Sequence, residues 1–200
     1  VEVGVTVRGD TPACVDQTVA EAPLRLAGYS LGVVYQPAQS GLPDRCQGTA
    51  VLEARRPFLA TVNHATDATR HVTAYPAVGA EAAATTVALP LLGRAYGPHR
   101  LSSEVTVMNT GPVPAAVELA YWDARSGQRA ACGAPCRVVV PALRSATYRL
   151  RREPFIASGS HGSGLVTSDQ PVVVVVTEAA EGGTVDASSY IGRPVPPVDP

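Results

Sequence analysis

Residues 48 to 63 read GTAVLEARRPFLATVN, and residues 162 to 177 read GSGLVTSDQPVVVVVT. Each stretch opens with a glycine and small residues, has a proline nine positions after that glycine, and continues into an apolar run. Two stretches that share this order within one chain indicate a repeated unit. The sequence therefore predicts two copies of one fold.

The match continues on both sides of these stretches. Upstream, residues 1 to 5 align with residues 117 to 121, and residues 24 to 31 align with residues 143 to 150. Downstream, Tyr75 aligns with Tyr190. The offset between partners lies between about 114 and 119 residues, which is the pattern of one duplicated domain whose loops then changed length.

Short strands separated by turn residues fill the second copy. The chain has 18 Pro and 18 Gly against two Phe and one Met, and helix-length amphipathic patterns are missing. This spacing is typical of a β-sandwich. We predict an all-β chain of two tandem immunoglobulin-like β-sandwich domains. The expected strands of the second copy lie near residues 85–92, 102–109, 115–122, 136–140, 144–150, 162–168, 171–178 and 185–191.

The first copy begins in the middle of the pattern, since nothing corresponds to the two strands expected within residues 85 to 111. We predict a truncated sandwich over residues 1–80, a complete one over residues 81–193 and a proline-rich tail over residues 194–200. A sheet without its opening strands exposes an unpaired edge. The candidate assembly edge is formed by Val1, Val3, Val5 and Val7. Either another chain supplies the missing strands, or they lie upstream in the same polypeptide.

The four cysteines fall two to each copy, as Cys14 with Cys46 and Cys132 with Cys136. This even division favours one disulfide in each domain and an oxidising compartment. Free thiols or a metal site at Cys132 and Cys136 remain the alternatives. A zinc site is poorly supported because no second ligand pair of suitable spacing follows.

The formal net charge of -1 gives no electrostatic case for nucleic-acid binding. The longest apolar run, residues 171 to 177, is too short to span a bilayer. We therefore expect neither a nucleic-acid partner nor a membrane span in this segment.

Four segments together resemble the tandem β-sandwich repeats of secreted bacterial cell-surface proteins. They are LPLL at residues 89–92, EVTVMNTG at 104–111, VPA at 140–142 and GLVTSDQPV at 164–172. The resemblance covers residues 85 to 192 well and residues 1 to 78 in part. It implies an extracellular, repeat-built, non-catalytic module, and it carries over no active site.

Residue patterns for catalysis or metal binding are weak throughout. His64, Asp67 and His71 form the only close cluster of histidines and acids, and the repeat places them in a loop between two strands. The segment 158 to 164 contains serines and His161 but lacks the G-x-S-x-G order of a nucleophile elbow. Asp123, Glu153, Asp169 and Glu178 are scattered beside turns. We predict no enzyme, no metal and no cofactor.

Two further sequence features are of kinds that can serve recognition. Arg8-Gly9-Asp10 matches an integrin-recognition tripeptide, but Gly-Asp after a strand is ordinary turn chemistry. Trp122 is the single tryptophan, and alternation places it on the same strand face as Glu118 and Ala120. Partial exposure would suit an interface or a carbohydrate contact.

These expectations combine into one functional prediction. The chain is expected to be an extracellular structural or assembly protein, such as a head-to-tail filament or surface-layer subunit joined by β-strand complementation. Its partner would be another copy of itself or another cell-surface protein. The alternative is a carbohydrate-binding or accessory module of a larger secreted protein.

Overall fold

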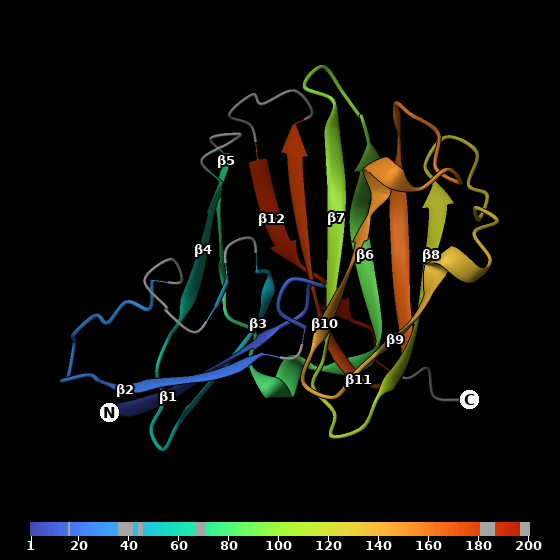
Figure 1. Cartoon of the computed structure of the whole chain (residues 1–200). Helices are drawn as coiled ribbons and strands as arrows, with labels where there is room; N and C mark the ends of the chain where they lie inside the picture. Colours follow the sequence, from blue (N-terminus) through green and yellow to red (C-terminus); the bar gives the residue numbers. More distant parts are fainter. Residues whose placement is uncertain (16, 36–41, 44–45, 67–70, 181–186, 197–200) are drawn as a thin grey trace. The chain divides into compact units, whose positions relative to one another are not determined.

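The computed structural model describes residues 1–15, 17–35, 42–43, 46–66, 71–180 and 187–196. Strands dominate these residues, and the helices among them are single 3-10 turns (Figure 1). The predicted all-β class is therefore confirmed. Within the same residues, no helix has the length and apolarity that a membrane span requires. The elements are β1 (Glu2–Gly9), β2 (Thr18–Arg25), β3 (Gly48–Ala54), β4 (Thr61–Thr66), β5 (His71–Pro76), η2 (Ala80–Ala82), β6 (Ala84–Arg94), β7 (Leu101–Asn109), β8 (Ala115–Asp123), η3 (Ala134–Cys136), β9 (Arg137–Val140), β10 (Ser145–Arg149), η4 (Leu150–Arg152), β11 (Ser160–Ala180), β12 (Ala187–Ile191) and β13 (Arg193–Pro194).

The chain divides into two compact units, Val1–Leu59 and Ala60–Pro200. This division differs from the boundary predicted at residues 80 to 81, because the β4–β5 hairpin belongs to the second unit. There β5 lies against β12. The separation into one truncated and one complete folding domain stays a prediction.

Strand β11 organises the second unit because its two halves have different neighbours. Residues 160 to 167 pair with β6 and residues 162 to 168 pair with β8. Residues 172 to 180 pair with β7, and residues 175 to 179 pair also with β12, while Val172 keeps one pairing with Ala84 of β6. The register shifts between Thr167 and Val172, where the strand passes from one set of partners to the other. β9 extends the first group beyond β8, and β10 extends the second beyond β7. β13 pairs with the other edge of β6.

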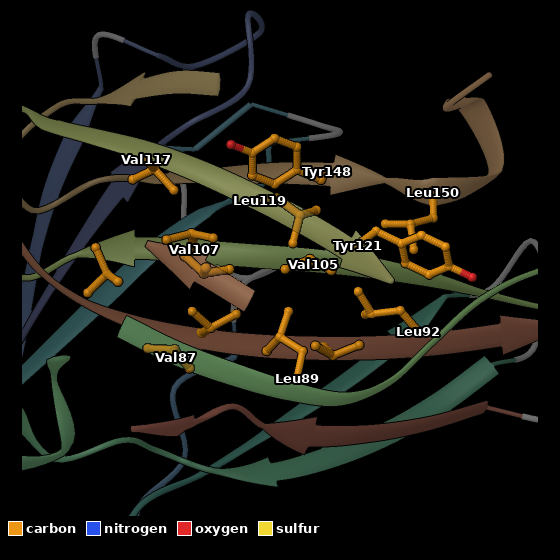
Figure 2. Close-up of a cluster of buried hydrophobic side chains, with 14 of the residues drawn as sticks. Val87, Leu89, Leu92, Val105, Val107, Val117, Leu119, Tyr121, Tyr148 and Leu150 are labelled. Carbon is orange, nitrogen blue, oxygen red and sulfur yellow. The ribbon is translucent and has the colours of Figure 1, made fainter. Parts of the chain in front are cut away.

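Apolar side chains from these strands fill a single core. Figure 2 shows Leu89, Val105, Leu119 and Tyr148 turned toward one another from four different strands. Alternation along β8 is as predicted, since Val117, Leu119 and Tyr121 are all buried. The run of valines at residues 172 to 176 is buried at four of its five positions, which explains why it lacks the alternation of a strand with one wet face.

The turn predicted at residues 168 to 171 is wrong, because β11 continues through it. The polar residues there connect the strand to its neighbours. The backbone N–H of Ala116 donates to the Asp169 carboxylate over 2.8 Å, and the hydroxyl of Thr110 donates to the main-chain oxygen of Pro171 over 2.8 Å. A Ser-Asp-Gln-Pro sequence has turn character, but strands on both sides hold it extended.

The first unit is a three-stranded sheet in the order β2-β1-β3. β1 is therefore central, with antiparallel partners on both sides, and Val3 and Val5 are buried. The candidate edge at Val1, Val3, Val5 and Val7 was thus placed in the wrong strand. The sequence showed an apolar strand near the start of the chain but did not show that β2 and β3 would both pair with it.

Both predicted disulfides are present. Cys14 is bonded to Cys46 across 32 positions of sequence, and Cys132 is bonded to Cys136 across 4. In each pair the Cα atoms are 5.7 Å apart, within the usual range for a disulfide. The first bond ties the β1–β2 connection to the segment entering β3, and the second closes a short turn before β9.

Strand pairing repeats between the copies in one register. Gly9 lies opposite Gly48 where β1 meets β3, and Asp123 lies opposite Gly162 where β8 meets β11. Each residue of the second pair follows its counterpart by 114 positions. A side chain at Gly48 would collide with the carbonyl oxygen of Arg8, and one at Gly162 would collide with that of Trp122. Both glycines are therefore required by the same close approach of two backbones.

The same offset relates the next strands. β1 pairs with β2 through Val3 and Leu24, and β8 pairs with β9 through Val117 and Val138. Leu24 therefore corresponds to Val138, which corrects the sequence alignment of Leu24 with Leu143. Likewise Val3, and not Val1, corresponds to Val117. β1, β2 and β3 are thus the first-copy counterparts of β8, β9 and the first half of β11.

Candidate functional site

Three places in the first copy correspond to positions where β6 or β7 pairs in the second copy. In the second copy, β6 pairs with the first half of β11, and β7 lies between β10 and the second half of β11. The first-copy counterparts of the segments that pair with β6 or β7 are β3 for the first half of β11, residues 31 to 35 for β10, and β4 for the second half of β11. Each is described below within its own unit.

β3 has one partner strand in the described part of the chain, namely β1. Its counterpart, residues 162 to 168 of β11, has two. Gly48 and Ala50 are exposed, whereas their counterparts Gly162 and Gly164 are buried. Among the described residues of its unit, the edge of β3 that corresponds to the β6 side of β11 is therefore open.

Residues 27 to 35 correspond to residues 141 to 149. The two segments form the same tight turn, at residues 27 to 30 and 141 to 144, and differ after it. Tyr29 and Leu143 both have a positive φ, 59° and 56°, which is uncommon for large side chains. The N–H of Ser30 donates to the carbonyl of Ala27 over 3.3 Å, and that of Arg144 donates to the carbonyl of Pro141 over 3.2 Å. The chain adopts the same turn in both copies.

After this turn the second copy forms β10, which pairs with β7, whereas residues 31 to 35 belong to no strand. Leu31 is 89% exposed and Val33 is 71% exposed. Their counterparts are Ser145 and Thr147, and the hydroxyl of Thr147 contacts that of Thr106 on β7 over 2.9 Å. The first copy thus exposes apolar side chains where the second copy has small polar ones.

β4 corresponds to residues 175 to 180 of β11, because Val62 lies opposite Tyr75 as Val176 lies opposite Tyr190. In the described residues β4 pairs with β5 alone. Residues 57 to 60, just before β4, are in no strand, and Leu59 is fully exposed. Its counterpart Val173 is 9% exposed, in the stretch of β11 that pairs with β7.

Trp122 is partly exposed, as predicted, and it is part of a charged cluster. The Arg129 guanidinium lies 5.8 Å from the centre of the indole ring. Arg129 and Arg137 also donate to the Glu118 carboxylate over 2.7 and 3.1 Å. Beside these groups lies a hollow of about 330 Å³ that is also lined by the Cys132–Cys136 turn. One face of the indole is occupied by the arginine, which leaves less ring surface for a stacked sugar.

The acids noted in the sequence have local structural roles. Asp123 accepts hydrogen bonds from the N–H and hydroxyl of Ser126 over 2.8 and 2.9 Å, and these bonds lower the pKa of its carboxyl group. Glu178 is buried and accepts from the hydroxyls of Ser103 and Ser188, each over 3.2 Å. Asp169 binds the backbone of β8, as described above. These contacts give no pair of acids facing a common cleft.

The histidine cluster is only partly described. His64 lies in β4 and His71 begins β5, so the loop predicted over this segment is shorter than expected; Asp67 lies outside the described residues. His161 stacks on Tyr96 with ring centroids 4.2 Å apart. The neighbouring hydroxyl of Ser160 donates to the carbonyl of Ala157 over 2.6 Å. Among the described residues, no group of three His, Cys, Asp or Glu is suited to hold a metal ion.

The Arg8-Gly9-Asp10 tripeptide is held inside its unit. Gly9 is buried, and the Thr49 hydroxyl donates to the Asp10 carboxylate over 2.7 Å. A side chain at Gly9 would collide with Cys14. The tripeptide thus serves the turn that leads from β1 to the disulfide.

Comparison with known proteins gives no family. No family model matches the chain, and no curated protein does. Among solved structures, the Thermotoga maritima protein 1070 is similar over 56% of this chain and 95% of its own, with a TM-score of 0.43 and 16% identity. The Anabaena sensory rhodopsin transducer is similar over 46% of this chain and 91% of its own, with a TM-score of 0.36 and 22% identity.

Proposed function

We propose that the chain is a structural module of the bacterial cell exterior and that it assembles through β-strand complementation of its first copy. The observation that carries this proposal is the agreement of three separate places. β3, residues 31 to 35 and β4 all correspond to positions where β6 or β7 pairs in the second copy. Two consecutive strands of one added segment would serve β3 and residues 31 to 35, which both belong to the unit Val1–Leu59.

The added segment is a strand pair of the β6–β7 type supplied by a neighbouring chain. Its main chain would pair with β3 and with residues 31 to 34, and its alternate apolar side chains would cover Leu31 and Val33. Strand addition of this kind gains affinity from backbone hydrogen bonds and specificity from the side chains. Donor and acceptor surfaces differ, so repetition gives an open filament unless the rotation closes.

Two disulfides support an extracellular location, because such bonds persist in oxidising compartments. A non-catalytic role agrees with the local structural use of Asp123, Asp169 and Glu178. The resemblance to secreted surface repeats points the same way, although it rests on structural residues.

The experiment uses a synthetic peptide with the sequence of residues 84 to 111, which holds β6 and β7 of the chain itself. Added to the intact protein, it is expected to bind saturably and to protect backbone amides of β3 and residues 31 to 34 from hydrogen exchange. Val33→Asp should abolish binding. Val139→Asp, at an exposed position on β9, should leave it unchanged. A scrambled peptide is the second control. Absence of binding to the folded protein would overturn the proposal.

Carbohydrate binding is the second candidate, because Trp122 is partly exposed beside the polar hollow. Isothermal titration calorimetry with soluble polysaccharides addresses it directly, because the heat of binding can be measured without Trp122, the single tryptophan. A saturable heat signal that disappears in Arg129→Ala as well as Trp122→Phe would favour this candidate over assembly.

A further inference from the structure

The β4–β5 hairpin of the first copy meets the second copy along strand β12. Both elements belong to the unit Ala60–Pro200, in which β5 lies against β12 (Figure 1). The hydroxyl of Ser189 on β12 donates to the main-chain oxygen of Ala74 on β5 over 2.9 Å. β5 pairs with β4 on its other side, and β12 pairs with β11. The order of neighbouring strands is therefore β4, β5, β12, β11, and among the described residues β5 and β12 meet through these contacts without a ladder of backbone hydrogen bonds.

The two residues in this contact hold the same position in their copies. Asn63 lies opposite Ala74 in the first copy, and Thr177 lies opposite Ser189 in the second. Since Asn63 corresponds to Thr177, Ala74 corresponds to Ser189. In the first copy this contact uses the edge of β5 that faces away from β4. In the second copy it uses the edge of β12 that faces away from the second half of β11. Equivalent edges thus meet at equivalent residues.

We infer that this edge is a self-complementary interaction surface and that its partner is the same edge of a second repeat. A contact between identical edges is isologous. Because both edges are then occupied, the result is a closed pair that cannot grow further through this surface. A head-to-tail contact would instead place the β4 edge of one repeat against the β12 edge of the next. Growth of an assembly must then use other edges, such as those of β3 or β4. This inference holds whether or not strand complementation occurs.

Cysteine pairs in the full chain test the geometry. Ala74→Cys with Ser189→Cys should form an internal disulfide on mild oxidation, because the Ser189 side chain already reaches the Ala74 backbone. Asn63→Cys with Ser189→Cys is the matched control. It moves one thiol to the next strand, so the Cα atoms lie roughly 10 Å apart, beyond the reach of a disulfide. Intact mass and peptide mapping without reduction give the readout. Cross-linking of the control pair, or of neither pair, would overturn the inference.

Self-association provides the second test. Ala74→Asp places a carboxylate against β12 and should separate β5 from β12. The free edge of β12 should then pair with the β12 edge of another molecule. In a Val33→Asp background, which removes strand complementation, sedimentation should show a dimer fraction that rises with concentration and no larger species. In the same background Asn63→Asp should remain monomeric. A ladder of larger species, or a monomer at every concentration, would show that the edge is not self-complementary.

Discussion

Strand β11 and its counterpart in the first copy have the same opening and the same length of sequence but different structures. β11 runs unbroken over Ser160–Ala180, whereas the equivalent residues form β3 and β4 with a strandless stretch between them. β6 and β7 hold the middle of β11 on both sides of its register shift. Among the described residues, no strand takes their place beside β3 or β4. The continuity of β11 therefore comes from its neighbouring strands.

Burial follows the same difference. Val172, Val173 and Val174 are buried, while their counterparts Phe58, Leu59 and Ala60 are half-buried or exposed. Apolar residues are thus kept at both places, but the second copy alone covers them with strands of its own. Three predictions use this contrast.

The largest effect is expected for Val174→Asp. This substitution buries an unpaired carboxylate in the middle of β11 and should lower the free energy of unfolding of the second copy by several kcal/mol, on the order of 4. Leu59→Asp, at a fully exposed position beside the counterpart of Val174, should change it little. Chemical denaturation of both variants is the measurement. Equal losses would mean that the two regions are covered alike.

A smaller difference is expected between the disulfides. Replacing Cys14 and Cys46 by serine opens the longer loop and should cost about 4 kcal/mol in the chain-entropy account, against about 2 kcal/mol for Cys132 and Cys136. The first unit, a single three-stranded sheet, should respond more strongly. Thermal melting of the two double-serine variants gives the order. A reversed order would argue that the short turn before β9 holds the core.

The smallest effect concerns alkaline pH and a tyrosine that both copies share. Burial raises the pKa of Tyr190 to about 12, and burial also raises the pKa of its counterpart Tyr75. Because the folded pKa of Tyr190 lies above the unfolded value of about 10, its contribution is complete below pH 10. That contribution is lost as pH rises toward 12.

Tyr190→Phe should therefore flatten the decline of stability between pH 10 and pH 12, measured by urea denaturation across that range. Tyr75→Phe should flatten it as well, since the two positions correspond. A decline that is unchanged in Tyr190→Phe would assign the alkaline sensitivity to another group, such as Tyr148, whose pKa is also raised by burial.

Much of the second copy could be predicted because its signals are local. Alternation along residues 115 to 122 placed Val117, Leu119 and Tyr121 on one side of β8, which is buried, although Ala120 on the other side is buried too. Proline and glycine marked most strand ends. The turn expected at residues 168 to 171 is wrong, because the local preference of Ser, Asp and Pro for turns was outweighed by strand pairing before and after this stretch, with β8 up to Ser168 and with β7 from Val172. The duplication was visible in the sequence, but its register was not. Sequence similarity aligned Leu24 with Leu143, whereas strand pairing shows that Leu24 corresponds to Val138.

The open edges lay partly within reach of the sequence. Within the described part of residues 1 to 80 no strand corresponds to β6 or β7, and the sequence pattern already predicted this difference between the copies. Which edges are open could not be read from it: the apolar pattern of Val3, Val5 and Val7 suits an edge and a central strand equally well.

The sequence by itself determined the all-β class, the duplication and the pairing of the cysteines, because each of these depends on residue type and spacing along the chain. The tertiary structure alone decided that β1 is central, that β11 is continuous and that β5 meets β12. Those outcomes depend on which strand finds which partner, and a strand's own residues do not specify its neighbours. The reason is physical: backbone hydrogen bonds between strands are the same for every sequence, so partner choice is settled by the burial of side chains from distant segments.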